Sequence, residues 1–204
     1  VVNWEEYVDN WYLGVHKQNS KGTEYSIFAD ILFKIGYSKE ALEFYRQAQY
    51  YFRKNNDTNN QEQCLICIAN TYYQLSDYKR AIKAYRYLLK IADRTKNSIN
   101  RGICLFGLSN CFLALGEYEK AFKDYYEAYQ IAKERKDRTS EGSLLSCLGN
   151  TCNYLNNYEA GIKFFEESIS IAKECGDKGG EGLRYGNLGI IYDNLQNYDK
   201  AIYY

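Results

Sequence analysis

The sequence predicts an all-α protein, an α-solenoid built from about five helix pairs. Two observations predict this fold. The chain has 204 residues and no proline, although ordinary usage of about 5% would give roughly ten, and proline breaks helix interiors. The sequence also repeats itself with a fixed 40-residue period and without a gap. A fixed period of this length is typical of stacked helical repeats.

Aligned columns of side chains show the 40-residue period. A small residue occupies the same place in every repeat, at Ala41, Ala81, Ala121, Gly161 and Ala201. An aromatic ring follows four residues later, at Tyr45, Tyr85, Tyr125 and Phe165. An aliphatic column marks the middle of each repeat, at Ile35, Leu75, Leu115, Leu155 and Leu195, and from the second repeat on a tyrosine follows three residues later, at Tyr78, Tyr118, Tyr158 and Tyr198.

Within one repeat, the apolar residues have the spacing of helices. Leu145, Leu148 and Cys152 lie three and four residues apart and so share one helix face. A second stripe begins at Tyr158, which predicts helices near 142–155 and 158–174 and a closing loop at 175–180. The predicted units are an amphipathic N-terminal helical segment or cap (1–20), repeats at 21–60, 61–100, 101–140 and 141–180, and an incomplete fifth repeat at 181–204.

The order of these residues resembles the tetratricopeptide repeat. In the second repeat the pattern of large, small and aromatic side chains reads Leu65, Ile68, Ala69, Tyr72, Ala81, Tyr85 and Leu88. The usual period of that family is 34, and we expect the additional residues to lengthen the second helix of each pair. Residues 176–192 resemble most closely the 40-residue form found in the G-protein-signalling modulator (Pins/LGN) and rapsyn type of array. The resemblance implies a right-handed superhelix whose first helices line a concave groove.

One polar column is not explained by packing alone. Asn70, Asn110 and Asn150 directly follow the small residue of three consecutive first helices, where a solvated helix would more often carry Glu or Lys. The resemblance implies that these amides bind the main chain of an extended peptide, because an amide both donates and accepts hydrogen bonds. Alternatively, they bond across to the adjacent repeat. Further candidates for the same peptide-binding face are Tyr73, Asn153, Arg184 and Asn187.

Composition argues against several functional classes. The 26 basic and 26 acidic residues balance, so no field of one sign would attract nucleic acid. The longest apolar runs are too short for membrane insertion. Seven cysteines without a secretory leader predict reduced thiols in a cytoplasmic protein. Because the chain does not begin with Met, we expect it to be a piece of a longer protein.

No residue pattern predicts catalysis, a metal or another cofactor. Cys64 and Cys67 form a CxxC motif, but they share columns with Cys104, Leu144, Gly107 and Cys147, as small core residues do. The single histidine, His16, lies outside the repeats, and no phosphate-binding or hydrolase motif occurs. We therefore expect a non-enzyme without cofactors.

Taken together, these patterns predict a scaffold that binds a peptide or helix of a partner protein in its concave groove. The alternative is a structural building block, held by its convex face and ends in a large cytoskeletal or ciliary assembly. A third reading, the helical accessory domain of an enzyme, would need a catalytic domain elsewhere in a longer protein. Substitutions at the groove asparagines would separate the first two readings.

Overall fold

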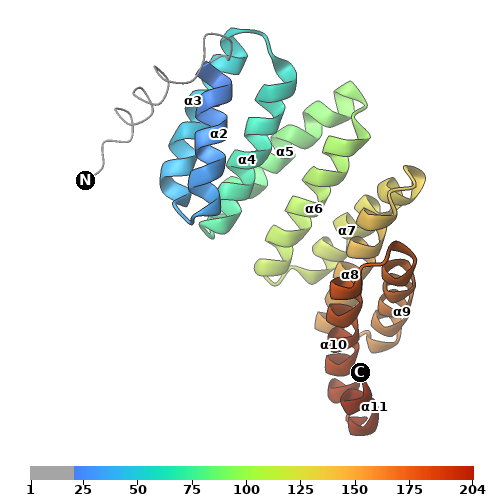
Figure 1. The fold of residues 1–204 in the computed structure, drawn as a ribbon. Coiled ribbons are helices and arrows are strands. Elements are labelled where there is room, and N and C mark those ends of the chain that lie inside the picture. Colours follow the sequence, from blue (N-terminus) through green and yellow to red (C-terminus); the bar gives the residue numbers. More distant parts are fainter. Residues whose placement is uncertain (1–20) are drawn as a thin grey trace. The chain divides into compact units, whose positions relative to one another are not determined.

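A computed structural model describes residues 21–204, and that range contains helices and turns but no strand (Figure 1). It divides into two compact units, whose boundary falls after Leu88 inside helix α5. The predicted cap at 1–20 and His16 lie outside the described residues. The helices are α2 (Lys21–Lys34), α3 (Ser38–Lys54), α4 (Thr58–Gln74), α5 (Tyr78–Thr95), α6 (Ser98–Ala114), α7 (Tyr118–Glu134), α8 (Arg138–Tyr154), α9 (Tyr158–Cys175), α10 (Lys178–Asn194) and α11 (Tyr198–Tyr203).

From α2 to α4 and from α6 to α11, each helix packs against the next one along the chain. In the first unit α3 packs on both α2 and α4, and in the second unit the contacts run from α6 through α11 in order. These pairs confirm the all-α solenoid that the 40-residue columns predict. Ile91 and Ala92 lie inside α5, but first and second helices are nearly equal in length, with 17 residues in α4 and 18 in α5, so the additional residues are not confined to the second helix.

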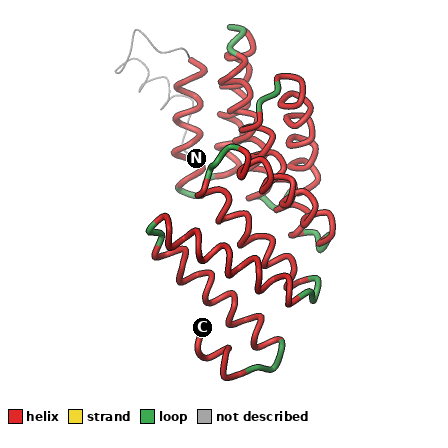
Figure 2. Tube along the Cα trace, turned by 90° about the vertical axis from the view of Figure 1, so that its right-hand side faces the viewer, coloured by secondary structure: helices red, strands yellow, loops and turns green. Residues whose placement is uncertain are grey.

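Nearly identical turns connect the helices, so the loops in the tube view are short (Figure 2). Each turn contains one residue with a positive φ, and these residues recur at even intervals: Gly36, Asn56, Ser76, Lys96, Gly116, Lys136, Asn156, Gly176 and Gln196. The N–H of the following residue donates to the carbonyl five positions back, as Asp137 does to Ala132 at 2.9 Å. This is the Schellman pattern. The 40-residue repeat therefore consists of two helix-and-turn segments of equal length.

The first helix of each repeat begins earlier than the apolar stripe predicts. Helix α8 starts at Arg138 rather than near 142, and α10 starts at Lys178, inside the loop expected at 175–180. The cause is an N-cap whose side chain accepts a hydrogen bond from the backbone N–H three residues on. A cap of this kind precedes each of the helices α4, α6, α8 and α10, at Asp57, Asn97, Asp137 and Asp177, with distances of 3.1, 3.1, 3.1 and 2.8 Å.

The Asp137 cap is expected to give a pH-dependent contribution to stability. The backbone N–H and the hydroxyl of Ser140 lower the pKa of this carboxyl. The ionised cap therefore stabilises the fold above the unfolded pKa of about 3.9, and this contribution is lost as the pH falls through that value and the lower folded pKa. We expect Asp137→Ala to reduce the free energy of unfolding by about 1 kcal/mol at pH 7 and by less at pH 3, measured by urea denaturation. Asn97→Ala is the matched control, because an amide cap does not titrate. An equal loss at both pH values for Asp137→Ala would contradict this account.

Small residues at the helix crossings let paired helices approach closely, as the small columns predict. Ala29 and Ala41 are completely buried in the core of the first unit. In the second unit, a Cβ on Gly161 would lie 3.2 Å from the carbonyl oxygen of Gly149. The backbones of α8 and α9 therefore approach more closely than side chains at these positions would allow.

Candidate functional site

Helix α6 presents an exposed apolar stripe. Ile99, Ile103 and Phe106 lie four and three residues apart on one face, and they are 50%, 38% and 40% exposed. Asn110 continues the same face four residues later. The corresponding residues are mostly polar in α4 (Asn59, Gln63 and Ile66) and all polar in α8 (Thr139, Ser143 and Ser146). This stripe is therefore a feature of the third repeat rather than a requirement of the helix-pair architecture.

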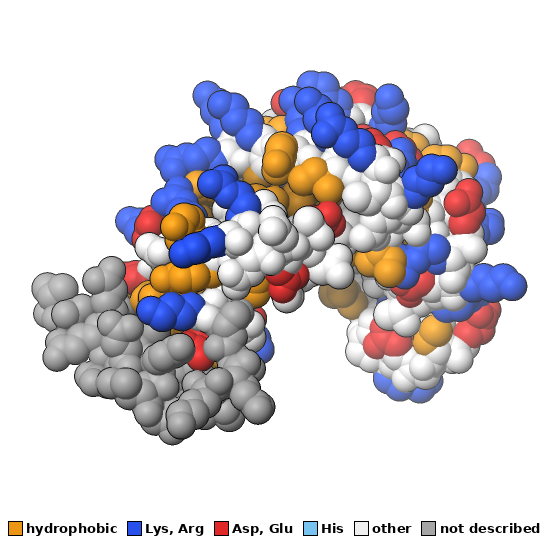
Figure 3. Space-filling view, turned by 90° about the horizontal axis from the view of Figure 1, so that it is seen from above, with side chains coloured by type: hydrophobic (Ala, Val, Ile, Leu, Met, Phe, Trp, Pro, Cys, Tyr) orange, Lys and Arg blue, Asp and Glu red, His pale blue; other side chains and the backbone are white. Residues whose placement is uncertain are grey.

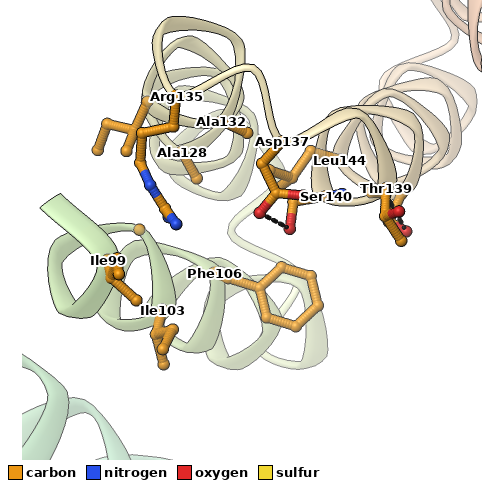
Figure 4. Close-up of a pocket in the computed structure, with 13 residues that line it drawn as sticks. Ile99, Ile103, Phe106, Ala128, Ala132, Arg135, Asp137, Thr139, Ser140 and Leu144 are labelled. Atoms are coloured by element: carbon orange, nitrogen blue, oxygen red, sulfur yellow. Dashed lines mark hydrogen bonds between the residues drawn. The ribbon is translucent and has the colours of Figure 1, made fainter.

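A cavity of about 420 Å³ lies beside this stripe, between α6 and α8, with α7 behind it. In Figure 4, Phe106 extends from α6 toward Ser140 at the start of α8, and Arg135 extends from the end of α7 toward α6. Gly102 leaves room in the cavity because it has no side chain. The nearest atom to a Cβ placed there would be Cγ2 of Ile131, at 3.7 Å. Its volume lies within the roughly 300–1,000 Å³ of small-molecule and side-chain pockets. The residue columns of the sequence did not predict this cavity, although the apolar spacing of Ile99, Ile103 and Phe106 was a usable signal for it.

Two of the three predicted asparagines are held by a tyrosine of their own repeat. The hydroxyl of Tyr85 donates to Oδ1 of Asn70, and that of Tyr125 donates to Oδ1 of Asn110. This corrects the alternative in which the column bonds across to the adjacent repeat. Since the tyrosine occupies the amide oxygen, the NH₂ group of each asparagine remains a donor, and no protein acceptor for it is seen within residues 21–204.

In the first repeat an aspartate takes the place of the asparagine that accepts from the tyrosine, and in the fourth repeat this hydrogen bond is missing. In the first repeat Tyr45 donates to Asp30 at 2.6 Å, and burial together with this bond raises the pKa of the Tyr45 phenol. In the fourth repeat, Phe165 has no hydroxyl. Asn150 is half-buried, and its amide has no hydrogen-bond partner among the described residues. Asn150 therefore has both its donor and its acceptor available on α8.

The remaining predicted residues have different environments. The ring of Tyr73 lies 5.6 Å from that of Tyr78 in the first unit. Asn153 accepts a hydrogen bond of 2.9 Å from Nδ2 of Asn194 in the next repeat. Asn187 is half-buried on α10. Of the candidates in the second unit, Asn110, Asn150 and Asn153 thus lie on the two helices that border the cavity, and the amide oxygen of Asn153 is engaged by Asn194.

Arg184 does not fit the predicted binding face, because its side chain is buried. Nε donates to Oγ of Ser168 at 2.6 Å, and Nη1 donates to Oδ2 of Asp177 at 3.3 Å. Ser168 in turn donates to the carbonyl of Gly142 at 2.5 Å. A buried cation is retained where its donors are satisfied in this way. Arg184 is therefore better described as part of the α8–α9–α10 packing, and we leave it out of the proposed site.

The CxxC cysteines have the environment of core residues. Cys64 is buried on α4 and Cys67 is half-buried one turn later. Burial raises the pKa of Cys64 to about 12 and that of Cys67 to about 11, which disfavours the thiolate that binds metals. Over residues 21–204, no group of three or more His, Cys, Asp or Glu side chains could hold a metal ion. In the same range no helix combines the length and the apolar character that crossing a membrane requires.

Comparisons with known proteins identify the repeat. A family model described as tetratricopeptide repeat matches residues 60–134 and 140–204, and a second model with the same description matches residues 25–55. A comparison with curated protein sequences finds no match.

Solved structures show the same fold at low sequence identity. The apo form of RapI has a TM-score of 0.80 at 16% identity, covering 93% of this chain and 71% of that one. BtubC (BKLC) from P. vanneervenii has a TM-score of 0.81 at 19% identity, covering 97% and 83%. A Rap protein complexed with competence and sporulation factor has a TM-score of 0.78 at 18% identity, covering 95% and 54%.

Proposed function

Because the chain belongs to the tetratricopeptide repeat family, we propose that it is a non-catalytic scaffold whose second unit binds an extended peptide of a partner protein across α6 and α8. One observation carries the proposal, the cavity between these helices beside the exposed stripe of Ile99, Ile103 and Phe106. The cavity accepts an apolar side chain of the peptide, which gives the interaction its selectivity.

The asparagines of α6 and α8 supply contacts to the peptide backbone. Asn110 offers its NH₂ group to a main-chain carbonyl, because Tyr125 occupies its oxygen. Asn150 both donates and accepts, because Phe165 leaves its amide unpaired. Each such hydrogen bond contributes about 0.5–1.5 kcal/mol net. The amides thus set the register of the peptide, while the apolar anchor supplies more of the affinity.

Other findings support a protein-binding role in general terms. The Rap structure complexed with competence and sporulation factor shows that a protein of similar fold binds a partner molecule. We also propose that the array is of the Pins/LGN and rapsyn type and that the protein is cytoplasmic. The alternative of a cytoskeletal or ciliary building block predicts instead that substitutions on the convex face and at the ends disrupt association.

A peptide selection tests the proposal. The full chain is used to select from a random ten-residue peptide library, and we expect enriched sequences to share one large apolar residue. The affinity of an enriched peptide should fall at least tenfold, about 1.4 kcal/mol, in Phe106→Ala, and about two- to tenfold in Asn150→Ala. Gln63→Ala, at the position in α4 that corresponds to Ile103, is the matched control and should leave the affinity unchanged.

Two results would overturn the proposal. One is a selection that yields no enriched sequence from a chain whose circular dichroism shows it to be folded. The other is a bound peptide whose affinity is the same for the natural chain and for Phe106→Ala.

A further inference from the structure

Helix α5 carries a strong excess of positive charge in a chain whose net charge is zero. Its residues include six cations and one acid: Lys79, Arg80, Lys83, Arg86, Lys90, Arg94 and Asp93. Lys and Arg side chains also stand out on the face of the molecule drawn in Figure 3, where acidic side chains lie among them. On α5 itself, Asp93 is the single acidic residue.

Five of these cations form a basic stripe along one face of the helix. The basic stripe consists of Lys79, Lys83, Arg86, Lys90 and Arg94. Their spacings of four, three, four and four residues keep them on one face. All five side chains are exposed, and the stripe extends over about 22 Å at 1.5 Å per residue. Tyr87 is exposed beside it.

The basic stripe is not neutralised by the described part of the chain. None of its five residues forms an ion pair within residues 21–204. Arg80, outside the stripe, pairs with Asp77 at 2.7 Å. The only acid of α5, Asp93, pairs with Arg101 at 2.9 Å. The charge of the stripe therefore remains available to a partner.

Packing does not require a cation at either end of the stripe, although Lys83 recurs as Lys123 and Lys163 in the next two repeats. The residues that correspond to Lys79 in the next two repeats are Glu119 and Glu159, and those that correspond to Arg94 are Glu134 and Glu174. Cations in the first turn of a helix also oppose its macrodipole, and cations four residues apart on one face repel each other. Arg94 lies in the last turn, where a cation favours the macrodipole. The cost to α5 therefore comes from the cations of the first turn and from the mutual repulsion, and an anionic partner would relieve both.

We propose that the basic stripe of α5 is a second binding surface, which takes an acidic segment of a partner protein. An extended segment of about seven residues matches the length of the stripe at roughly 3.3 Å per residue. A protein segment fits better than a long polyanion, because the net charge of zero supplies no long-range field for one. It fits better than a membrane surface, because Tyr87 is the sole large apolar side chain exposed on α5.

Fluorescence anisotropy tests this proposal without knowledge of the natural partner. The probe is a labelled 16-residue peptide of alternating Glu and Ala, measured with the full chain at 50 and 200 mM NaCl. We expect binding at the lower salt concentration and at least tenfold weaker binding at the higher one, since salt screens exposed charges. A single-stranded 16-nucleotide DNA and vesicles with phosphatidylserine serve as comparison ligands.

Two variants with the same change in net charge separate the stripe from a general charge effect. Lys83→Glu/Arg86→Glu/Lys90→Glu should weaken peptide binding at least tenfold. Lys123→Glu/Lys136→Glu/Lys178→Glu reverses three exposed lysines outside α5 and should change it less than twofold. Equal losses in both variants, absence of peptide binding to the natural chain, or tighter binding of the DNA or the vesicles would each overturn the proposal. Circular dichroism establishes that both variants remain helical.

Discussion

Phe165→Ala is expected to lower the free energy of unfolding by about 3–5 kcal/mol, the usual cost of removing a large buried aromatic side chain. Phe165 is 0% exposed. It belongs to the core cluster formed with Ile169, Leu188 and Ile191, and its ring also covers Gly149. The substitution therefore opens a cavity that is bordered by α8, α9 and α10, and backbone relaxation cannot fill it fully.

Urea denaturation followed by circular dichroism measures this loss. Phe106→Ala is the matched control, because Phe106 is 40% exposed on the apolar stripe of α6. We expect that variant to lose less than about 1.5 kcal/mol, in line with the smaller area it removes from contact. Similar losses in the two variants would contradict the assignment of Phe165 to the core and of Phe106 to the binding face.

Gly149→Ala is expected to destabilise the protein by about 1–3 kcal/mol, the usual cost of overpacking a core. The added Cβ would lie 2.8–2.9 Å from three carbon atoms of the Phe165 ring. In a helix interior, alanine normally stabilises a protein by about 1 kcal/mol relative to glycine. Here we expect a loss of stability instead, because the overpacking outweighs this gain in helix propensity. The first three repeats carry Ala29, Ala69 and Ser109 at this position, and their aromatic column holds tyrosine rather than phenylalanine.

Gly186→Ala is the control with the opposite expected result. Gly186 lies inside α10, and a Cβ there would meet nothing within 4 Å. We expect a gain of about 0.5–1 kcal/mol in the free energy of unfolding. Thermal and urea denaturation of both variants would check the contrast, and a gain in Gly149→Ala would show that the Phe165 ring moves aside at little cost.

The repeat columns predict most of the fold because they record direct packing contacts. The second helix of the fourth repeat begins at Tyr158, as its apolar stripe indicates. The first helix begins before its stripe because the cap, Asp137, is a polar residue that an apolar pattern does not register. The burial of Arg184 could have been predicted, since it shares a column with the buried core residues Cys64, Cys104 and Leu144.

The candidate site was only partly predictable. The asparagine column marks the relevant face, and the tyrosine that recurs at a constant distance after Asn70 and Asn110 was a usable signal for their pairing. The cavity depends on the separation of α6 from α8 and on the place that Gly102 leaves open. That separation results from the packing of three helices together, and no column of a single repeat encodes it.

The even spacing of the turns has a consequence for how the chain reaches this structure. Because every turn is short and each helix contacts chiefly its neighbours in sequence, no segment must find a distant partner before the core begins to form. Chains dominated by such local contacts fold faster than chains of similar stability that depend on long-range pairings. Any adjacent pair of helices can serve as the starting point, with the others adding to it from either side.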